Sequence, residues 1–250
     1  MIMNLKKITI SDMSCELFLP AGYEKSTRRY PVIYVNGEIP VREVLTEIVA
    51  AGAQPDFIVL ALCPKDWNDD FTPWPAPAIR RDEAPPQGRA GEYIGKLCGE
   101  IKPYMDANYR TMPEPKHTAL MGYSLGGLTA LYSLYLTDSF GMVGSISGSL
   151  WYDGFCEFME KRKPIRPEVK VYLSLGRREK RSRDPRMGKV AECTEVARCL
   201  LLRQLALQDA GGDVKDMQAD GGEVYFEWNE GGHFHETGKR FAKAIVWWIE

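Results

Sequence analysis

Short runs of apolar, often β-branched residues alternate along the chain with longer segments in which apolar residues recur every three or four positions. The first pattern is typical of strands and the second of helices that bury one face. Strands are expected at Lys7–Ser11, Cys15–Leu19, Pro31–Val35, Phe57–Leu62, Thr118–Tyr123, Val143–Ser147, Val169–Leu175 and Val224–Trp228. The alternation predicts a mostly parallel α/β sheet of about eight strands, with helices on both faces and an antiparallel hairpin of the first two strands at one edge.

Two segments outside these strands have helical spacing. In the first, the apolar positions are Tyr93, Leu97, Ile101 and Met105. Pro103 lies inside this segment, and because proline has no N–H and crowds the preceding turn, the helix is expected to kink or restart there. In the second, near the C-terminus, the apolar positions are Phe241, Ile245, Trp248 and Ile249. This spacing predicts a final helix with one apolar face.

The length of 250 residues, without repeats, low-complexity tracts or linkers, predicts a single domain over residues 1–250. Basic and acidic residues nearly cancel, 32 against 34, so the chain as a whole has no field that would attract nucleic acid or an anionic membrane. Polar residues interrupt the N-terminal apolar stretch, and no apolar run approaches the length of a membrane span. Neither a signal peptide nor a membrane segment is therefore expected, and the oligomeric state is left open.

The cysteines and histidines indicate neither disulfides nor a metal site. The six cysteines are Cys15, Cys63, Cys98, Cys156, Cys193 and Cys199. They form no CxxC pair, and a chain of this size does not need disulfides for stability, so reduced thiols in a cytoplasmic protein are expected. The three histidines lack a Cys or carboxylate cluster at ligand spacing, and phosphate-loop and dinucleotide motifs are absent. No metal or cofactor is expected.

The strongest chemical signal is Gly122-Tyr123-Ser124-Leu125-Gly126, a GxSxG motif between a predicted strand and a helical segment. A serine on a sharp strand-to-helix turn needs small residues two positions before and after it, and the two glycines meet this need. The amide of Leu125 and the start of the helix would then lie near a reacting carbonyl, where they stabilise an oxyanion. The context favours a nucleophilic Ser124 over an ordinary glycine-rich turn.

A serine nucleophile needs a base, and only three histidines exist to provide one. His117 precedes the strand that leads to Ser124, so the whole strand would separate the two. His233 follows a Glu-Gly-Gly segment after the last predicted strand and before the final helix, where a base could reach the nucleophile. We favour His233 as general base and interpret His235 as a helix-starting or supporting residue.

An acid is expected after the strand Val169–Leu175, where it would bind the other ring nitrogen of the base and fix its tautomer. Glu179 lies three residues past Gly176, and Asp184 lies eight past it. We favour Glu179, with Asp184 or no protein acid as alternatives.

The turn Asn36-Gly37-Glu38, after the strand Pro31–Val35, is expected to supply the second oxyanion donor. Gly37 would let the backbone approach a substrate closely. The sequence leaves open whether the amide of Gly37 or that of Glu38 points inward.

Two loops are expected to border the site. Residues 64–88 hold six prolines, form a longer connection than usual, and include Trp74, an expected substrate-binding side chain. Residues 177–186 are far more basic than the rest of the chain. They form either a solvated charged loop or, through Arg177 and Arg178, a clamp for an anionic group on a small-molecule ester.

Several segments together resemble the putative esterase family of α/β-hydrolases, which contains esterase D, feruloyl esterases, the antigen 85 mycolyltransferases and the enterochelin-type siderophore esterases. The segments are YPVIYVNGE, DDFTPW, IKPYMDANYRT, MGYSLGG, SGSLWYDGF and EWNEGGHFHE. Their joint order along most of the chain is much more specific than GxSxG alone. The resemblance implies the α/β-hydrolase fold, with Ser124 and His233 as nucleophile and base. It also implies that Glu179 occupies the acid position and that Leu125 supplies an oxyanion-hole amide.

The sequence therefore predicts a serine esterase that forms an acyl-enzyme on Ser124 and acts on a siderophore-type ester, an acylated sugar or a small acyl ester. An acyltransferase of the same fold, which passes the acyl group to an alcohol, is the first alternative. A non-catalytic binding protein of this fold is the second, and the retained serine, histidine and carboxylate speak against it.

Overall fold

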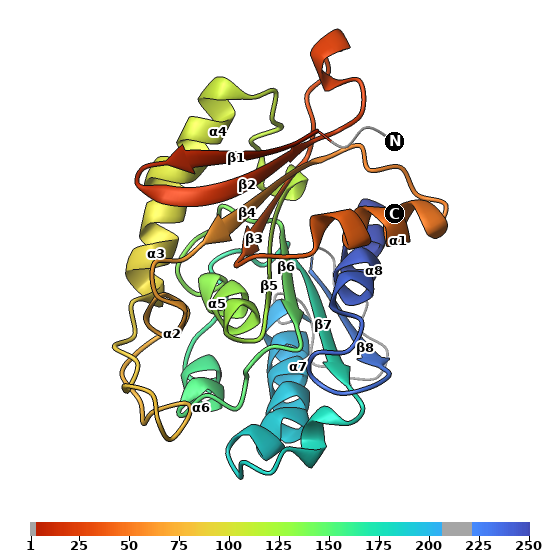
Figure 1. The fold of residues 1–250 in the computed structure, drawn as a ribbon. Coiled ribbons are helices and arrows are strands. Elements are labelled where there is room, and N and C mark those ends of the chain that lie inside the picture. Colours follow the sequence, from red (N-terminus) through yellow and green to blue (C-terminus); the bar gives the residue numbers. More distant parts are fainter. Residues whose placement is uncertain (1–3, 207–221) are drawn as a thin grey trace.

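The computed structural model describes residues 4–206 and 222–250, and within them eight strands form a single sheet (Figure 1). The strands are β1 Asn4–Ile10, β2 Met13–Leu19, β3 Val32–Asn36, β4 Ile58–Cys63, β5 Thr118–Tyr123, β6 Met142–Ile146, β7 Lys170–Gly176 and β8 Glu223–Asn229. Their order is β1-β2-β4-β3-β5-β6-β7-β8. β2 pairs antiparallel with both β1 and β4, and the other neighbours are parallel. The prediction of a mostly parallel sheet with an antiparallel hairpin at one edge is confirmed.

Helices cover both faces of the sheet. They are α1 Val41–Ala50, α2 Trp67–Asp70, α3 Ala90–Lys96, the π-helical turn η2 Leu97–Ile101, α4 Lys102–Asn108, α5 Leu125–Ser133, α6 Phe155–Glu160, α7 Val190–Ala206 and α8 Thr237–Ile249. Short 3-10 turns are η1 Tyr23–Lys25, η3 Pro115–His117, η4 Glu179–Arg181 and η5 Met187–Lys189. α1 and α8 pack on one face, and α3 to α7 pack on the other (Figure 1).

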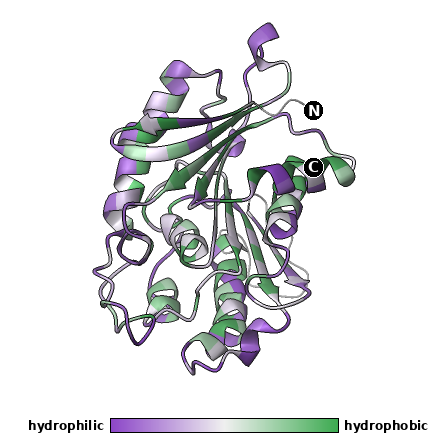
Figure 2. Cartoon of the chain, viewed as in Figure 1, coloured by the Kyte–Doolittle hydropathy of each residue, from purple (hydrophilic) through white to green (hydrophobic). Residues whose placement is uncertain are grey.

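Two hydrophobic cores lie on opposite sides of the sheet because successive residues of a strand point to opposite faces. In β3, Ile33 and Val35 join the core under α1 and α8, whereas Tyr34 joins the core on the other face. Both faces are covered, so the central strands are apolar along their whole length, as parallel strands usually are. Figure 2 shows hydrophobic residues along the central strands and on the helices, and hydrophilic residues in the outer loops.

The two predicted helical segments are present. The first runs from α3 through η2 to α4, and Pro103 lies in the first turn of α4. The wider π-helical turn directly before Pro103 interrupts the regular ladder where the proline ring would otherwise crowd it, so the expected restart is confirmed. In α8, Phe241 and Ile245 are buried, whereas Ile249 is 37% exposed. Ile249 is therefore not part of the apolar face, because the helix ends there.

The parallel strands β3, β5, β6, β7 and β8 end at the same edge of the sheet. The loops that leave this edge carry Gly37, Ser124, Ser147, Glu179 and His233 in chain order. Open parallel sheets bind their ligands at the carboxyl ends of the strands. The topology thus gathers side chains that lie far apart in the sequence.

Candidate active site

Ser124 lies on the turn between β5 and α5 in a backbone conformation that few residues adopt. Its φ of 57° and ψ of −121° fall outside the regions usual for a residue with a side chain. A Cβ atom on Gly122 would lie 2.2 Å from the carbonyl carbon of Gly126, and one on Gly126 would lie 2.6 Å from the carbonyl oxygen of Asn36. Only glycine fits at these two positions, and the close packing between them forces the sharp turn.

Asn36, at the end of β3, fixes this turn from the neighbouring strand. Its side-chain amide donates to the carbonyl of Gly126 at 3.0 Å, and its Oδ1 accepts a hydrogen bond from the Tyr93 hydroxyl at 2.9 Å. Asn36 is 1% exposed, so both bonds lie in the interior. The sequence analysis assigned Asn36 to the oxyanion turn and missed its role in holding the serine loop.

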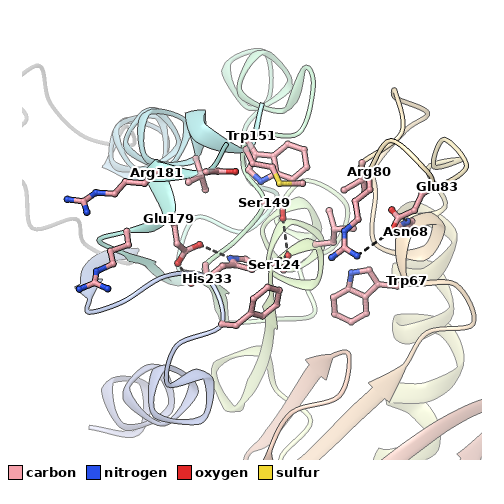
Figure 3. A pocket seen from close by; sticks show the side chains of 18 residues that line it. Trp67, Asn68, Arg80, Glu83, Ser124, Ser149, Trp151, Glu179, Arg181 and His233 are labelled. Carbon is pink, nitrogen blue, oxygen red and sulfur yellow. Dashed lines mark hydrogen bonds and ion pairs between the residues drawn. The ribbon is translucent and has the colours of Figure 1, made fainter. Parts of the chain in front are cut away.

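His233 connects Ser124 with Glu179. Its Nε2 lies 3.0 Å from the Ser124 hydroxyl oxygen, and its Nδ1 lies 2.7 Å from Oε2 of Glu179. Figure 3 shows the three side chains in line, with the Glu179 carboxylate on the side of the His233 ring opposite Ser124. The Tyr123 hydroxyl donates to the backbone carbonyl of His233 and so anchors the loop that carries it.

Glu179 is almost fully buried, and each of its oxygens has a partner. Oε2 is hydrogen-bonded to His233. Oε1 accepts hydrogen bonds from the Gly176 N–H at 2.7 Å and from the Ser147 hydroxyl at 2.8 Å. Burial by itself raises the pKa of Glu179. This effect is outweighed by the hydrogen bond to His233, the charge of that ring, and the hydrogen bonds from Gly176 and Ser147, so the pKa of Glu179 lies below its ordinary value. Glu179 is therefore a carboxylate at neutral pH.

A buried arginine, which the sequence analysis did not single out, completes this cluster. Arg240 of α8 is 1% exposed, and its Nη1 lies 2.9 Å from Oε1 of Glu179 and 2.6 Å from the Ser147 hydroxyl. The signal for it was an arginine on the same helical stripe as Phe241, Ala244 and Ile245, where a charge is unexpected. Ser149, also missed, has its hydroxyl oxygen 3.2 Å from that of Ser124 (Figure 3).

The alternative acid and the two other histidines lie elsewhere. Asp184 uses Oδ1 to accept the backbone N–H groups of Arg186 and Met187, at 2.8 and 3.1 Å. His235 is exposed and lies 3.5 Å from Glu236. His117 belongs to η3, at the opposite end of β5 from Ser124. The structure thus brings Glu179 and His233 to Ser124, and it leaves these three residues outside.

In the turn after β3, one backbone N–H already donates a hydrogen bond within the protein. The Gly37 N–H donates to the carbonyl of Leu62 at 2.9 Å, which corrects its assignment as an oxyanion donor and leaves the Glu38 amide as the candidate beside that of Leu125. Gly37 matters for its shape. Its φ is 91°, and a Cβ atom there would lie 2.6 Å from the Trp67 ring.

Ser124 and His233 open into a cavity of about 610 Å³. It is lined by Trp67, Asn68, Ile79, Arg80, Glu83, Ser124, Leu125, Ser147, Ser149, Trp151, Arg178, Glu179, Arg181, Ser182, Met187, Val190, His233 and Phe234. Aromatic rings and the long loop 64–88 form one part of the wall, and the basic segment after β7 forms another (Figure 3). Arg178, one of the two arginines proposed as a clamp, is among the lining residues.

Two predicted substrate-binding residues lie outside this lining. The Trp74 indole donates to the carbonyl of Asp153 at 2.8 Å and packs among other aromatic rings, so in this loop Trp67 faces the cavity instead. Arg177 pairs with Glu230 at 3.1 Å, away from the cavity, and Arg181 takes its place in the wall. Successive residues of a turn point in different directions, which the sequence could not resolve.

Within residues 4–206 and 222–250, no three His, Cys, Asp or Glu side chains are grouped so as to hold a metal ion. No helix in this part of the chain has the length and apolarity needed to cross a membrane. All six cysteines are free.

A family model with the description "Putative esterase" matches residues 7–231. The chain belongs to this esterase family. Among curated proteins, the uncharacterized protein YbbA of Bacillus subtilis (strain 168) is 27% identical over 172 residues, which make up 67% of this chain and 69% of the relative. Family membership indicates a hydrolase of the esterase class.

Solved structures with the same fold include an IroE-like serine hydrolase from Shewanella oneidensis, with a TM-score of 0.76 and 17% identity over 97% of this chain and 78% of the other. The siderophore hydrolase EstA from Aspergillus nidulans gives a TM-score of 0.70 and 18% identity over 98% and 93%. The enterobactin esterase FES from Shigella flexneri gives a TM-score of 0.69 and 16% identity over 98% of this chain and 58% of the other. These similarities confirm the predicted α/β-hydrolase fold of this esterase.

Proposed function

We propose that this chain is a serine esterase with Ser124 as nucleophile, His233 as general base and Glu179 as the acid that orients it. One observation carries the proposal, the unbroken chain from the Ser124 hydroxyl to His233 at 3.0 Å and from His233 to Glu179 at 2.7 Å. A serine hydroxyl is a weak nucleophile until a base takes its proton, and a histidine held by a carboxylate is the usual solution. The turn at Ser124 then serves as a nucleophile elbow.

The reaction begins when the Ser124 oxygen attacks the ester carbonyl and its proton passes to Nε2 of His233. The carbonyl oxygen becomes an oxyanion, which we assign to the backbone amides of Leu125 and Glu38. Collapse of this intermediate breaks the bond to the alcohol, which leaves with the proton from His233. Water, activated by the same ring, then attacks the acyl-enzyme and releases the acid.

The cavity favours a bulky ester with aromatic and anionic parts. Its volume is about 610 Å³, and Trp67, Trp151 and Phe234 line it together with Arg178 and Arg181. Rings offer flat apolar contact, and guanidinium groups bind carboxylate or other anionic oxygens in pairs. Two proteins of the same fold carry the names siderophore hydrolase and enterobactin esterase. A siderophore-type ester is therefore the substrate class that we propose.

A panel of esters tests this function. We expect wild-type protein to hydrolyse neutral short-chain aryl esters slowly and siderophore-type esters faster, and to be labelled by a fluorophosphonate probe at Ser124. Ser124→Ala is the matched control, which removes one oxygen atom and should abolish both turnover and labelling. Turnover that survives in Ser124→Ala would disprove the assignment. Adding an alcohol acceptor identifies any transfer product and so separates hydrolysis from acyl transfer.

A further inference from the structure

Arg240 carries a charge within the protein interior, yet the proposed reaction does not by itself require an arginine. A buried guanidinium destabilises a protein strongly unless it is paired and hydrogen-bonded. Its terminal nitrogens meet this condition. Nη1 reaches Glu179, Ser147 and, at 3.1 Å, the Tyr123 hydroxyl, and Nη2 donates to two backbone carbonyls.

The two carbonyls belong to the loop that carries His233. They are those of Glu230 and Gly232, each 2.9 Å from Nη2. One side chain thus bridges the acid on η4 and the histidine loop between β8 and α8. Movement of either partner would break hydrogen bonds in a region without free access to water, so Arg240 fixes the position of His233 relative to Glu179.

Ser147 supports the same arrangement from β6. Its φ of 48° is uncommon for a residue with a side chain, and its N–H donates to the carbonyl of Ser174 at 2.8 Å. In this conformation the hydroxyl donates to Glu179 and accepts from Arg240. Strain of this kind persists only where the surroundings hold it, and it is concentrated at functional sites.

The charges in this cluster bear on the reaction. Glu179 offers one oxygen to His233 and the other to Arg240, so one negative charge faces two cations once His233 has taken the serine proton. A cation close to an acid and a base keeps the acid ionised and opposes protonation of the base. The Arg240 charge therefore acts on the acid and on the base of the proposed reaction together.

Other titratable or charged groups lie on the cavity wall or on the elements next to the His233 loop. They are Tyr123 on β5, Arg80 and Glu83 in the loop before α3, Arg178 and Arg181 around η4, Glu230 after β8, the His235–Glu236 pair before α8, and Glu43 of α1 against Gly238. Burial raises the pKa of Tyr123, so its hydroxyl is neutral. The others lie on the cavity wall or at the surface, where water and salt weaken their fields. Arg240, at 1% exposure, is the cation that water screens least.

We propose that Arg240 is a positioning residue of the active site, which joins Glu179 to the His233 loop and sets through its charge the pH below which His233 stops acting as a base. This inference rests on the proposed esterase function. It assigns a role in the reaction to a residue of α8 that touches neither Ser124 nor the cavity.

The test is the pH dependence of kcat/KM on a neutral ester for the wild type, Arg240→Gln and Arg240→Lys. Removing the charge should move the midpoint of the acid limb of kcat/KM to higher pH by about one unit, since a nearby cation opposes protonation of a base. Lysine keeps the charge but cannot reach every acceptor, so Arg240→Lys should keep the wild-type midpoint with a lower kcat. A wild-type midpoint in Arg240→Gln would overturn the proposal, because a purely structural arginine lowers kcat equally at all pH values.

A second comparison uses Glu179→Gln alone and together with Arg240→Gln. In the single variant an unpaired buried guanidinium opposes the imidazolium of His233, and the double variant removes that opposition. We expect kcat/KM of the double variant to be several-fold higher than that of Glu179→Gln. A double variant that is less active than Glu179→Gln would contradict the charge role. Removing both charges also leaves no unpaired buried ion, so this variant can fold even where Arg240→Gln alone does not.

The failure of this inference can be told apart from the failure of the proposed function. If wild-type protein shows no turnover that depends on Ser124 and no fluorophosphonate labelling, the esterase assignment and with it this inference are overturned. If the wild type is active and the midpoint in Arg240→Gln is unshifted, the inference alone is overturned. Far-UV circular dichroism and thermal unfolding of each variant establish which proteins are folded.

Discussion

The floor and the rim of the cavity use arginine in opposite ways. Beneath the floor, which consists of Ser124, His233 and Glu179, Arg240 is 1% exposed and is bonded to a carboxylate, a serine hydroxyl and backbone carbonyls. On the rim, Arg178 and Arg181 are exposed. Neither has an ion-pair partner among residues 4–206 and 222–250. Both terminal nitrogens of Arg240 are bonded to fixed partners, whereas Arg178 and Arg181 remain exposed at the rim.

Burial explains the difference. In the interior a charge interacts strongly, so an arginine persists there only when its partners are fixed, and it then fixes them in turn. At the surface water screens the charge and the side chain keeps its rotamer freedom, so it contributes little to stability. We therefore expect the floor to control the chemical step and the rim to control substrate preference. Each experiment below perturbs one of the two regions and measures whether kcat, KM or the pH dependence changes.

The largest effect is expected from the floor residues that transfer the proton. Ser124→Ala and His233→Ala should each lower kcat at least about 1,000-fold, because residues that act as a unit fail together. His235→Ala is the matched histidine control and should keep most of the activity, since that side chain is exposed and pairs with Glu236. Steady-state kinetics on one ester measures all three. Loss of activity in His235→Ala with an active His233→Ala would reverse the assignment of the base.

The acid of the floor should give a smaller but still large effect. Glu179→Gln is expected to lower kcat at least about tenfold while KM changes little, because an amide cannot stabilise the imidazolium that forms. Asp184→Asn is the control, since that carboxylate caps a turn away from His233. Circular dichroism should find both variants folded. A Glu179→Gln variant as active as the wild type would reduce the site to Ser124 and His233.

As the pH falls, the protein should lose its esterase activity before it unfolds. The rate should fall within about pH 5 to 8 as His233 takes up a proton, because only the neutral ring can accept one from Ser124. The pKa of Glu179 is lowered in the folded protein. Its contribution to stability is therefore complete above the ordinary glutamate value of about 4.3 and is lost as the pH falls through the lower folded value.

Parallel measurements of kcat/KM and of circular dichroism against pH check this order. The reversible loss of activity should be nearly complete while the circular dichroism signal is still that of the native protein. A rate that stays constant from about pH 5 to 8 would contradict a histidine base. Unfolding that coincides with the loss of activity would show instead that activity is lost because the structure around Glu179 unfolds.

The rim should give the smallest effect, and it should appear in KM. Arg178→Ala combined with Arg181→Ala is expected to raise KM for anionic esters several-fold and to leave kcat and neutral esters almost unchanged. The effect should shrink as salt is added. Arg177→Ala is the matched control, because Arg177 pairs with Glu230 outside the cavity. Equal losses on anionic and neutral esters would indicate displacement of Glu179, which lies in the same segment.

Much of this site could be predicted because local sequence constrains it. The strands follow from apolar runs, and the sharp turn at Ser124 follows from Gly122 and Gly126, which no larger residue could replace. Glu179 and His233 each follow a strand that ends at the same edge of the sheet. Residues of this kind occupy positions that the order of elements along the chain already defines.

The residues that were misplaced or missed depend on side-chain direction and on long-range contacts. Arg177 and Arg181 lie in one basic segment, and only the path of the turn decides which faces the cavity. Trp74 and Trp67 share one loop, and the packing of Trp74 among other aromatic rings turns it away. Both pairs have the same residue type, so composition could not separate them.

The sequence by itself determined the fold class, the order of the strands along the chain and the identities of Ser124, His233 and Glu179 as candidates, because each rests on a short pattern. Only the tertiary structure decided that Gly37 gives its amide to Leu62 and that Arg240 lies beneath Glu179. Arg240 lies 61 positions after Glu179 in the chain. Which buried charge meets which partner depends on how α8 packs against the sheet, and hydrophobic burial over the whole chain determines that packing.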